Sequence, residues 1–425
     1  MLKLIVHHSP ALLSFLLSLK LNLSQPQFDH LVRMSDALIT TDMHHKTIAS
    51  LYRMIVDAPD PSNGCDHLRI SPWSVREVKA RTREYVIDEI VTESARTGER
   101  KLYVVLDDSL GEKDKETRHM AAVEFPHDHT KSQGKKQVYT NGTVHLEVRL
   151  QLGKMEYVFD WQLYLREKAV RRLNRGRSKE ERIRFRKKTS LALEMLKELN
   201  ELLPAGFQVY VLFDSWYASN RLLKFCRRRD WHVICAVKSN RLLNEMKLSQ
   251  WNQTLKHQRY EPVSLTATDQ RQKTYLVRVK HGRFKKLPFD VCVIISKRHH
   301  RDKRPKYFLS TDTSLAPQKI LRIYQKRWPI EVDNFYVKQH LGLTDFRVRS
   351  FEATEKWFAV VFLAYIFLQH RLNHAQPAEQ LRSIADVIRL HRQEHARTLL
   401  QTACQEAVRL TDYLPVIRKL ICSPA

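Results

Sequence analysis

Three short apolar runs, each rich in β-branched residues and each followed by polar residues, constrain the fold most strongly. They are KLYVVL (101–106), FQVYVLF (207–213) and WHVICAV (231–237). A continuous apolar run of this length predicts a central strand that is buried on both faces. Helical patterns near 189–203 and 217–229 precede the second and third runs. This alternation predicts an α/β core.

Two further runs predict antiparallel strands that join this core. TVHLEVRLQL (143–152) alternates apolar and polar residues with period two, and KMEYVFDWQLYL (154–165) follows it. Gly153 and Lys154 can form the turn between them, so the pair predicts a hairpin. Strand-like runs return between 258 and 310, where we expect a β-rich insertion. The expected fold class is therefore α/β, with a mixed sheet flanked by helices.

The chain is expected to be helical on both sides of the core. Apolar residues recur at three- and four-residue spacings in 27–39 and 45–56. That pattern predicts either a helix-turn-helix or two packed helices without DNA contact. The segment DAPDPSNG (57–64) predicts a loop, and a long helix is expected over 71–96. After about residue 350 the sequence is helical again, and the apolar segment 356–372 predicts a central packing helix.

The charge of the chain limits its partners. It carries 73 Lys and Arg against 46 Asp and Glu over 425 residues, a net charge of +27 that is not confined to one tail. This excess favours a polyanion, most simply nucleic acid, and a ribosome- or membrane-associated basic protein is the alternative. The basic run 166–188 fits either a solvated segment or a surface that follows a phosphate backbone. The length implies two or three domains.

Two features bear on the compartment. The apolar run 10–19 has only Lys3 before it, lacks a signal-peptide cleavage site and is too short to span a bilayer, so we expect a buried helix. The six cysteines contain no C-x-x-C pair and predict neither a zinc site nor a disulfide framework. A cytoplasmic protein in a reducing compartment, with no membrane association, is the expectation.

Acidic residues follow two of the predicted strands. Asp108 comes after the first central run, and Asp214 begins the segment DSW after the second. In open α/β sheets, functional side chains lie at such carboxyl ends of strands. Taken alone, each aspartate fits a helix cap or a turn equally well.

Glu331 lies in a more informative pattern. Tyr324, Arg327, Glu331 and Lys338 are separated by three, four and seven residues, so a continuous helix would place them on one face. Pro329 fits the first position of a helix, which we expect to run from 329 to 341 and to stop at Gly342. An ordinary surface ion pair between Arg327 and Glu331 is the alternative, but it leaves the tyrosine and the lysine unexplained.

Three carboxylates in these positions suit a hard cation. Mg²⁺ prefers carboxylate oxygens and keeps positions for water and phosphate oxygens. Two such ions can support in-line displacement at a phosphodiester. Arg327 and Lys338 would hold the DNA backbone, and Tyr324 could stack on an exposed base.

With these residues in place, the sequence resembles the DDE transposases of bacterial insertion sequences. The resemblance is to the superfamily typified by insertion sequence four, which has the signature Y-(2)-R-(3)-E-(6)-K. It implies an RNase H-like core, a metal-binding catalytic triad of Asp108, Asp214 and Glu331 with Asp107 as the alternative first ligand, and Mg²⁺ with Mn²⁺ as a substitute. Tyr324, Arg327, Lys338, Trp328 and Lys238 are the expected DNA contacts.

The resemblance also implies the organisation and partners of the chain. Double-stranded transposon ends and target DNA are the expected partners of a homodimer located at the bacterial nucleoid. The protein would cleave the ends and transfer the strands. The expected regions are a helical DNA-binding part (1–98), the first part of the core (99–240), the β-rich insertion (241–312), the core helix with Glu331 (313–350) and a helical C-terminal part (351–425).

Two other functions remain open from the sequence. A domesticated relative of a transposase would bind DNA without cutting it, although all three candidate carboxylates are present. A zinc-dependent hydrolase is suggested by His119, His127 and His129, but no general base or fourth ligand stands out beside them.

Overall fold

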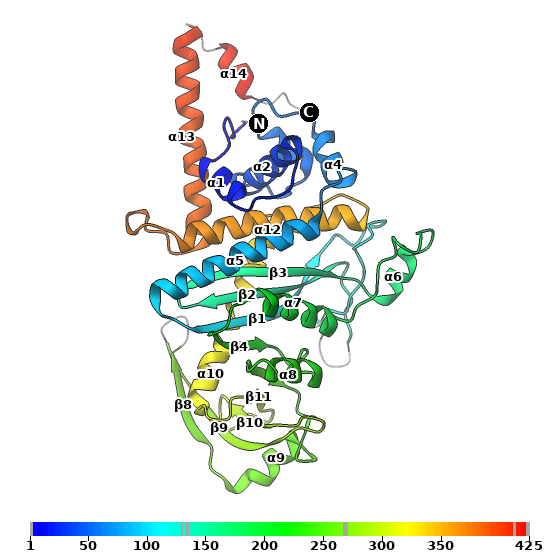
Figure 1. Cartoon of the computed structure of the whole chain (residues 1–425), viewed down its shortest axis with the longest axis vertical. Coiled ribbons are helices and arrows are strands. Elements are labelled where there is room, and N and C mark those ends of the chain that lie inside the picture. The colour runs from blue at the N-terminus through cyan, green and yellow to red at the C-terminus, as the bar shows by residue number, and fades with distance from the viewer. Residues whose placement is uncertain (1–2, 129–130, 133–135, 267–270, 411–413, 422–425) are drawn as a thin grey trace.

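A nine-stranded mixed sheet forms the centre of the protein (Figure 1). The computed structural model describes residues 3–128, 131–132, 136–266, 271–410 and 414–421. The strand order is β3-β2-β1-β4-β5-β11-β10-β9-β8. The strands are β1 (Lys101–Glu112), β2 (Gly142–Leu152), β3 (Met155–Tyr164), β4 (Gln208–Phe213), β5 (His232–Val237), β8 (Glu261–Thr266), β9 (Gln272–Arg283), β10 (Asp290–Lys297) and β11 (Lys306–Ser310).

The first five strands confirm the predicted α/β class and its RNase H-like arrangement. β1, β2 and β3 are antiparallel neighbours, and β4 and β5 continue the sheet parallel to β1. The hairpin between β2 and β3 turns at Gly153, where φ is +57°, a conformation that favours glycine. All three apolar runs of the sequence are therefore adjacent central strands.

The strands of the expected β-rich insertion extend this same sheet. β11 pairs antiparallel with β5, and β10, β9 and β8 follow in order, each antiparallel to its neighbour. β6 (Leu242–Leu243) and β7 (Met246–Lys247) form a small separate pair. Without β11, the side of β5 that does not pair with β4 would be an open sheet edge. Pairing with β11 satisfies the backbone groups on that side and continues the sheet.

Helices cover the two faces of the sheet according to the side-chain alternation of β1. Leu102, Val104 and Leu106 belong to the large core beneath α5 (Val75–Thr97), α7 (Lys188–Leu202) and α8 (Asn220–Arg227). Val105 lies on the opposite face and packs with the apolar residues of α10 (Pro317–Gln325) and with Ile330 of α11 (Pro329–Phe335). Successive side chains of a strand point to opposite faces, so alternate residues of β1 pack against different helices.

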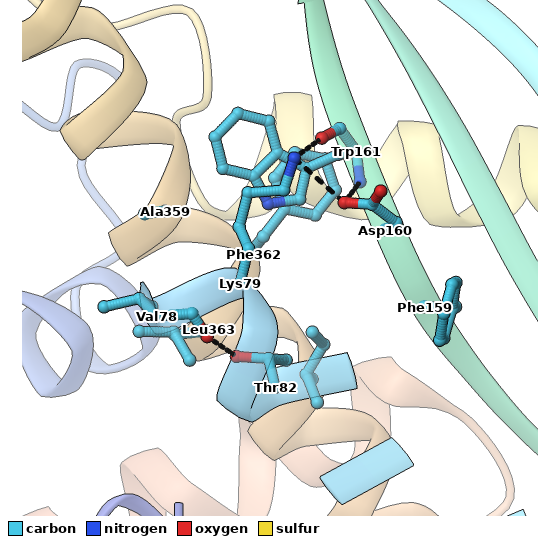
Figure 2. A pocket seen from close by; sticks show the side chains of 10 residues that line it. Val78, Lys79, Thr82, Phe159, Asp160, Trp161, Ala359, Phe362 and Leu363 are labelled. Carbon is cyan, nitrogen blue, oxygen red and sulfur yellow. Dashed lines mark hydrogen bonds and ion pairs between the residues drawn. The ribbon is translucent and has the colours of Figure 1, made fainter. Parts of the chain in front are cut away.

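A buried ion pair joins α5 to β3 at a small pocket beside α12 (Phe351–Asn373), shown in Figure 2. Lys79 Nζ lies 2.9 Å from Asp160 Oδ1 and also donates to the backbone carbonyl of Trp161. The same ammonium group lies 4.6 Å from the centre of the Trp161 ring. Because Asp160 is fully buried, this pairing compensates for a carboxylate that water does not reach.

The terminal helices pack together at one end of the sheet (Figure 1). They are α1 (Pro10–Ser18), α2 (Gln25–Thr40), α3 (Ile48–Arg53), α4 (Pro61–Arg69), α13 (Ile384–Leu410) and α14 (Leu414–Leu420). Two short helices, α6 (Glu167–Leu173) and α9 (Leu248–Thr254), lie elsewhere in the chain. α12 is the predicted central helix and is buried along most of its length. Among the described residues, no helix is both long and apolar enough to cross a membrane.

Two local predictions near the N-terminus need correction. Residues 57–64, predicted as a loop, contain the start of α4, because Asp60 caps the helix by accepting from the Ser62 backbone and Pro61 fits the first turn. The helix expected over 45–56 is shorter and begins after Thr47, whose hydroxyl caps it. The apolar run near the N-terminus does form α1, with Leu12 and Leu16 buried.

Candidate active site

Two aspartates lie side by side where the parallel pairing of β1 with β4 ends. The register pairs Leu106 with Phe213, and the next residues are Asp107, midway along β1, and Asp214, directly after β4. Asp107 lies in the same row of β1 as Val105, so its side chain points to the face covered by α10 and α11. The negative charge of Asp214 is close enough to raise the pKa of Asp107.

Arg327 connects this pair to Glu331. Its Nη1 donates to Asp107 Oδ2 at 2.5 Å and its Nη2 donates to Glu331 Oε1 at 2.6 Å. Arg327 follows α10, and Glu331 lies in the first turn of α11, one helical turn further on. The planar guanidinium group bonds the two carboxylates through separate nitrogens, in a fixed geometry that the single ammonium nitrogen of a lysine does not offer. Arg327 therefore joins Asp107 to Glu331, and its charge also acts on Asp214.

Asp108 lies on the other face of the sheet. Lys188 Nζ donates to its Oδ2 at 2.5 Å, and the Tyr217 hydroxyl donates to its Oδ1 at 2.6 Å. Lys188 begins α7, which covers the face opposite to α11. The structure thus groups Asp107 with Arg327 and Glu331, whereas the sequence prediction preferred Asp108 there and kept Asp107 as the alternative. The reason is the pleat of β1, which sends adjacent side chains in opposite directions.

The electrostatics of the carboxylate group favour binding of a cation. Burial raises the pKa of Asp107 to about 7 against the opposing Arg327 guanidinium, and the charges of Asp214 and Asp108 add to the rise. Burial also raises the pKa of Asp214. Carboxylates that crowd one another without enough positive charge hold protons, and a divalent cation would replace those protons. The oxygen-only donor set fits a hard ion such as Mg²⁺.

Buried polar contacts fix α11, and with it Glu331, against the sheet. Asp333 is 3% exposed and accepts from the Arg149 guanidinium of β2 and, at 2.6 Å, from the Tyr365 hydroxyl of α12. The next residue, Asn334, has its Oδ1 3.1 Å from Nε2 of His145, also on β2. These contacts lie on the side of α11 facing the protein interior, while the Glu331 side chain remains 40% exposed. The helix therefore presents Glu331 from a rigid base.

The remaining residues of the predicted signature occupy different environments. Lys338 Nζ donates to Ser109 Oγ at 2.9 Å, so it reaches the same face of β1 as Asp107. The Tyr324 ring packs 4.8 Å from that of Phe308, and burial raises its pKa to about 12. The predicted helix does begin at Pro329, but it changes from α11 to a π-helical segment, Tyr336–His340, before Gly342 ends it with φ +66°. Such π-helical turns are frequent at functional sites.

An aromatic and basic cluster beside the carboxylates was only partly foreseen. Trp216 is 48% exposed, and its ring lies 5.1 Å from Lys238 Nζ and 6.0 Å from Lys188 Nζ. Trp328, between α10 and α11, is 57% exposed. Lys238 and Trp328 were predicted contacts, whereas Trp216 and Lys188 were not singled out. The available signals were the tryptophan of DSW and the position of Lys188 at the end of the basic run.

His119 and His127, the two described histidines of those that suggested a zinc hydrolase, belong to no group of metal-ligating side chains among the described residues. His127 contacts Ser132 Oγ at 3.0 Å, and His119 is exposed in a bend with φ +63°. His129 lies outside the described residues. Within the described part of the chain, the groupings of metal-ligating side chains involve other histidines.

Comparison with known proteins identifies part of this region. Residues 186–367 match the family described as Transposase DDE domain, a segment that includes Asp214 and Glu331 and begins after Asp107 and Asp108. Among solved structures, the cryo-EM structure of the piggyBac transposase synaptic complex with hairpin DNA is similar, with a TM-score of 0.48 and 12% identity, covering 89% of this chain and 73% of that chain. No match is found among curated proteins. Residues 186–367 are thus similar to the transposase DDE domain family, and the match covers less than half of the chain.

Proposed function

We propose that this protein is a transposase that binds the inverted-repeat ends of a mobile element, cleaves them and transfers the strands to target DNA. The observation that carries the proposal is that Arg327 bonds Asp107 and Glu331 while the charge of Asp214 acts on Asp107. Asp214 and Glu331 also lie inside the segment that matches the transposase DDE domain. The net charge of +27 supports a DNA partner. Binding by a homodimer, with the terminal helices recognising the repeats, is part of the proposal.

The three carboxylates would hold the divalent ions, Mg²⁺ or its substitute Mn²⁺. When bound, these ions would activate the attacking oxygen and stabilise the leaving oxygen of the phosphodiester. Asp107 and Asp214 offer oxygens from adjacent strand ends, and Glu331 offers one from a helix fixed by Asp333. Arg327 bonds the carboxylates of Asp107 and Glu331. When the ions take its place between them, its guanidinium group can turn towards a phosphate.

Lys188 and the exposed aromatic residues would contact the DNA itself. Lys188, paired with Asp108, and Lys238 flank the exposed Trp216 ring. An exposed ring between two ammonium groups suits an unpaired base and its neighbouring phosphates. Trp328 could serve a second base in the same way. Tyr324, being half-buried against Phe308, is better suited to support Arg327 than to stack on DNA.

Asp214→Ala is expected to remove strand cleavage while leaving binding of the ends nearly unchanged. The substitution deletes metal-binding oxygens but no cation that meets phosphate. The assay is Mg²⁺-dependent cutting of a plasmid that carries the inverted repeats flanking this gene, with binding measured in parallel on the same DNA. Asp290→Ala is the matched control, because Asp290 is 62% exposed on β10.

Two outcomes would contradict the proposal. Unchanged cleavage by the Asp214→Ala protein would remove this residue from the site. Binding of the ends without any cutting by the native protein, with Mg²⁺ and with Mn²⁺, would identify a non-cleaving DNA-binding protein instead.

Lys338→Ala is expected to weaken binding of the ends and to reduce the slope of log affinity against log salt by about 1. Burial lowers the pKa of Lys338, but its contact with Ser109 places it on the same face of β1 as Asp107, where the proposed site would hold the phosphate that is cleaved. Ser109→Ala is the matched control, since it removes the hydroxyl that Lys338 contacts and keeps the charge. An equal slope for the native and Lys338→Ala proteins would show that the lysine supports β1 and not DNA.

A further inference from the structure

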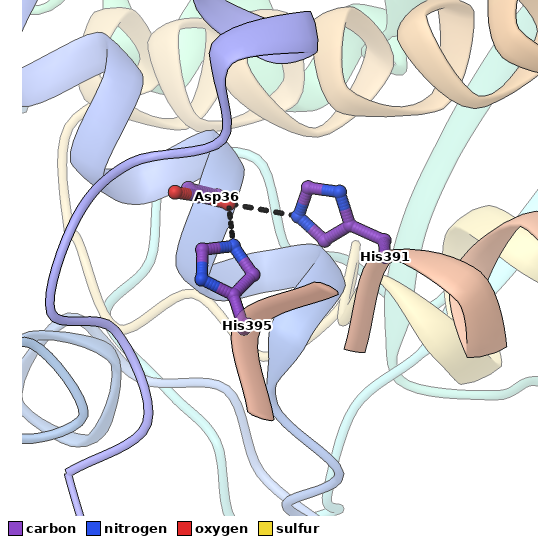
Figure 3. A group of neighbouring side chains, drawn as sticks. All are labelled: Asp36, His391 and His395. Atoms are coloured by element: carbon purple, nitrogen blue, oxygen red, sulfur yellow. Dashed lines mark hydrogen bonds and ion pairs between the residues drawn. The ribbon is translucent and has the colours of Figure 1, made fainter. Parts of the chain in front are cut away.

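A second group of ligand-type side chains lies away from the carboxylate site, between the N-terminal and C-terminal helices (Figure 3). His391 and His395 of α13 both point at Asp36 of α2, and the Nε2 atom of each lies 2.8 Å from Asp36 Oδ1. The three side chains are 0%, 2% and 4% exposed for Asp36, His391 and His395. Their ligand atoms all lie within 4.8 Å of one another.

The spacing of the two histidines distinguishes this group from an ordinary cluster of hydrogen-bonded core residues. The two histidines are four residues apart on one helix, so both imidazole nitrogens approach the same point from one side. That is the arrangement by which two histidines of a helix bind zinc. Imidazole nitrogen and carboxylate oxygen are ligands of Zn²⁺, whereas the oxygen-only site at Asp107 suits Mg²⁺. The two sites therefore call for different metals.

His8 and the backbone of Ser9 hold the other side of the same carboxylate. His8 Nδ1 lies 2.9 Å from Asp36 Oδ2, and the Ser9 backbone N–H donates to that oxygen at 3.2 Å. Asp36 is thus an oriented carboxylate, with one oxygen held by His8 and Ser9 and the other directed at two imidazoles. Outer contacts orient a metal ligand in the same way.

We propose that Asp36, His391 and His395 form a binding site for a Zn²⁺ ion that fastens α13 to α2. The ligand atoms are Asp36 Oδ1 and the two Nε2 atoms, with water in the fourth position and His8 orienting the carboxylate. On binding, each Nε2 gives up its proton, which moves to Nδ1 or to solvent, and the freed lone pair takes the ion. The site lies outside the segment that matches the transposase DDE domain.

The test uses the full-length protein, stripped with a chelator and then titrated with Zn²⁺ against a chromophoric competitor in excess Mg²⁺. The native chain is expected to bind one Zn²⁺ tightly, and the His391→Gln, His395→Gln double variant is expected to lose that ion. His370→Gln with His374→Gln is the matched control. That pair is also four residues apart on one helix and lies beside Glu89, but His370 Nδ1 bonds the Tyr85 hydroxyl and His374 is exposed, so the group is less enclosed than the one at Asp36. His8→Ala should weaken binding about ten- to a hundredfold.

A second measurement does not depend on any variant. In the stripped native protein, adding Zn²⁺ is expected to slow amide hydrogen exchange in α2 and in the first three turns of α13, because the ion joins the two helices. The proposal is overturned if the native chain binds no Zn²⁺, if the histidine double variant binds it as tightly as the native chain, or if exchange in both helices is unchanged by the ion.

Discussion

Asp107→Asn is expected to abolish strand cleavage, with a loss on the order of 10⁴-fold, whereas Asp108→Asn retains most of the activity. The two residues are adjacent in the sequence but face opposite sides of β1. Asp107 lies beside Asp214 and is bonded to Arg327, which is also bonded to Glu331. The Asn side chain keeps the volume and one oxygen but removes the negative charge that holds a divalent cation.

The Asp108→Asn variant is the control, because it changes the same chemical group one position along the strand. It removes the charge that pairs with Lys188 but keeps an oxygen that can accept from Lys188 or from the Tyr217 hydroxyl, so we expect only a modest loss of stability. Cleavage, end binding and thermal unfolding should be measured on both proteins. If Asp108→Asn loses cleavage and Asp107→Asn keeps it, the metal site lies on the α7 face and the proposed grouping is wrong.

Asp333→Ala is expected to lower the free energy of unfolding by about 3–5 kcal/mol, the cost of leaving one partner of a buried ion pair alone. Arg149 is 3% exposed, and removal of Asp333 would leave its guanidinium with Glu156 as its only carboxylate among the described residues. Tyr365 would also lose the acceptor of its hydroxyl. Urea unfolding of the metal-free protein measures the change as a shift of the midpoint at constant slope.

Glu331→Ala is the matched control, since Glu331 lies two residues away on the same helix. Its side chain is 40% exposed and its ion pair with Arg327 is four residues apart on the surface side, so its loss should cost less than about 1 kcal/mol. The two variants should therefore separate the roles of α11. Glu331→Ala removes cleavage from a stable protein, and Asp333→Ala destabilises the protein that carries Glu331. Equal stability of the two variants would show that the buried network does not anchor the helix.

Local patterns in the sequence were sufficient for most of the elements. The apolar runs became β1, β4 and β5, the alternating runs became the β2–β3 hairpin, and the 356–372 segment lies within α12. Each of these patterns reports how a few neighbouring residues meet a buried surface. The helix α4 was missed because its aspartate, prolines and glycine are also typical of loops, and the choice depends on what packs against them.

By itself, the sequence determined the fold class, the strand ends that carry acidic residues, and the position of Glu331 near the start of a helix. The tertiary structure alone decided that Asp107 and not Asp108 meets Arg327, because the facing of a strand depends on which helices cover it. It alone brought His391 and His395 to Asp36, which are 355 and 359 residues away along the chain. The periodicity of apolar residues describes only neighbours within one or two helical turns. Contacts between residues hundreds of positions apart exist only after the helices have packed.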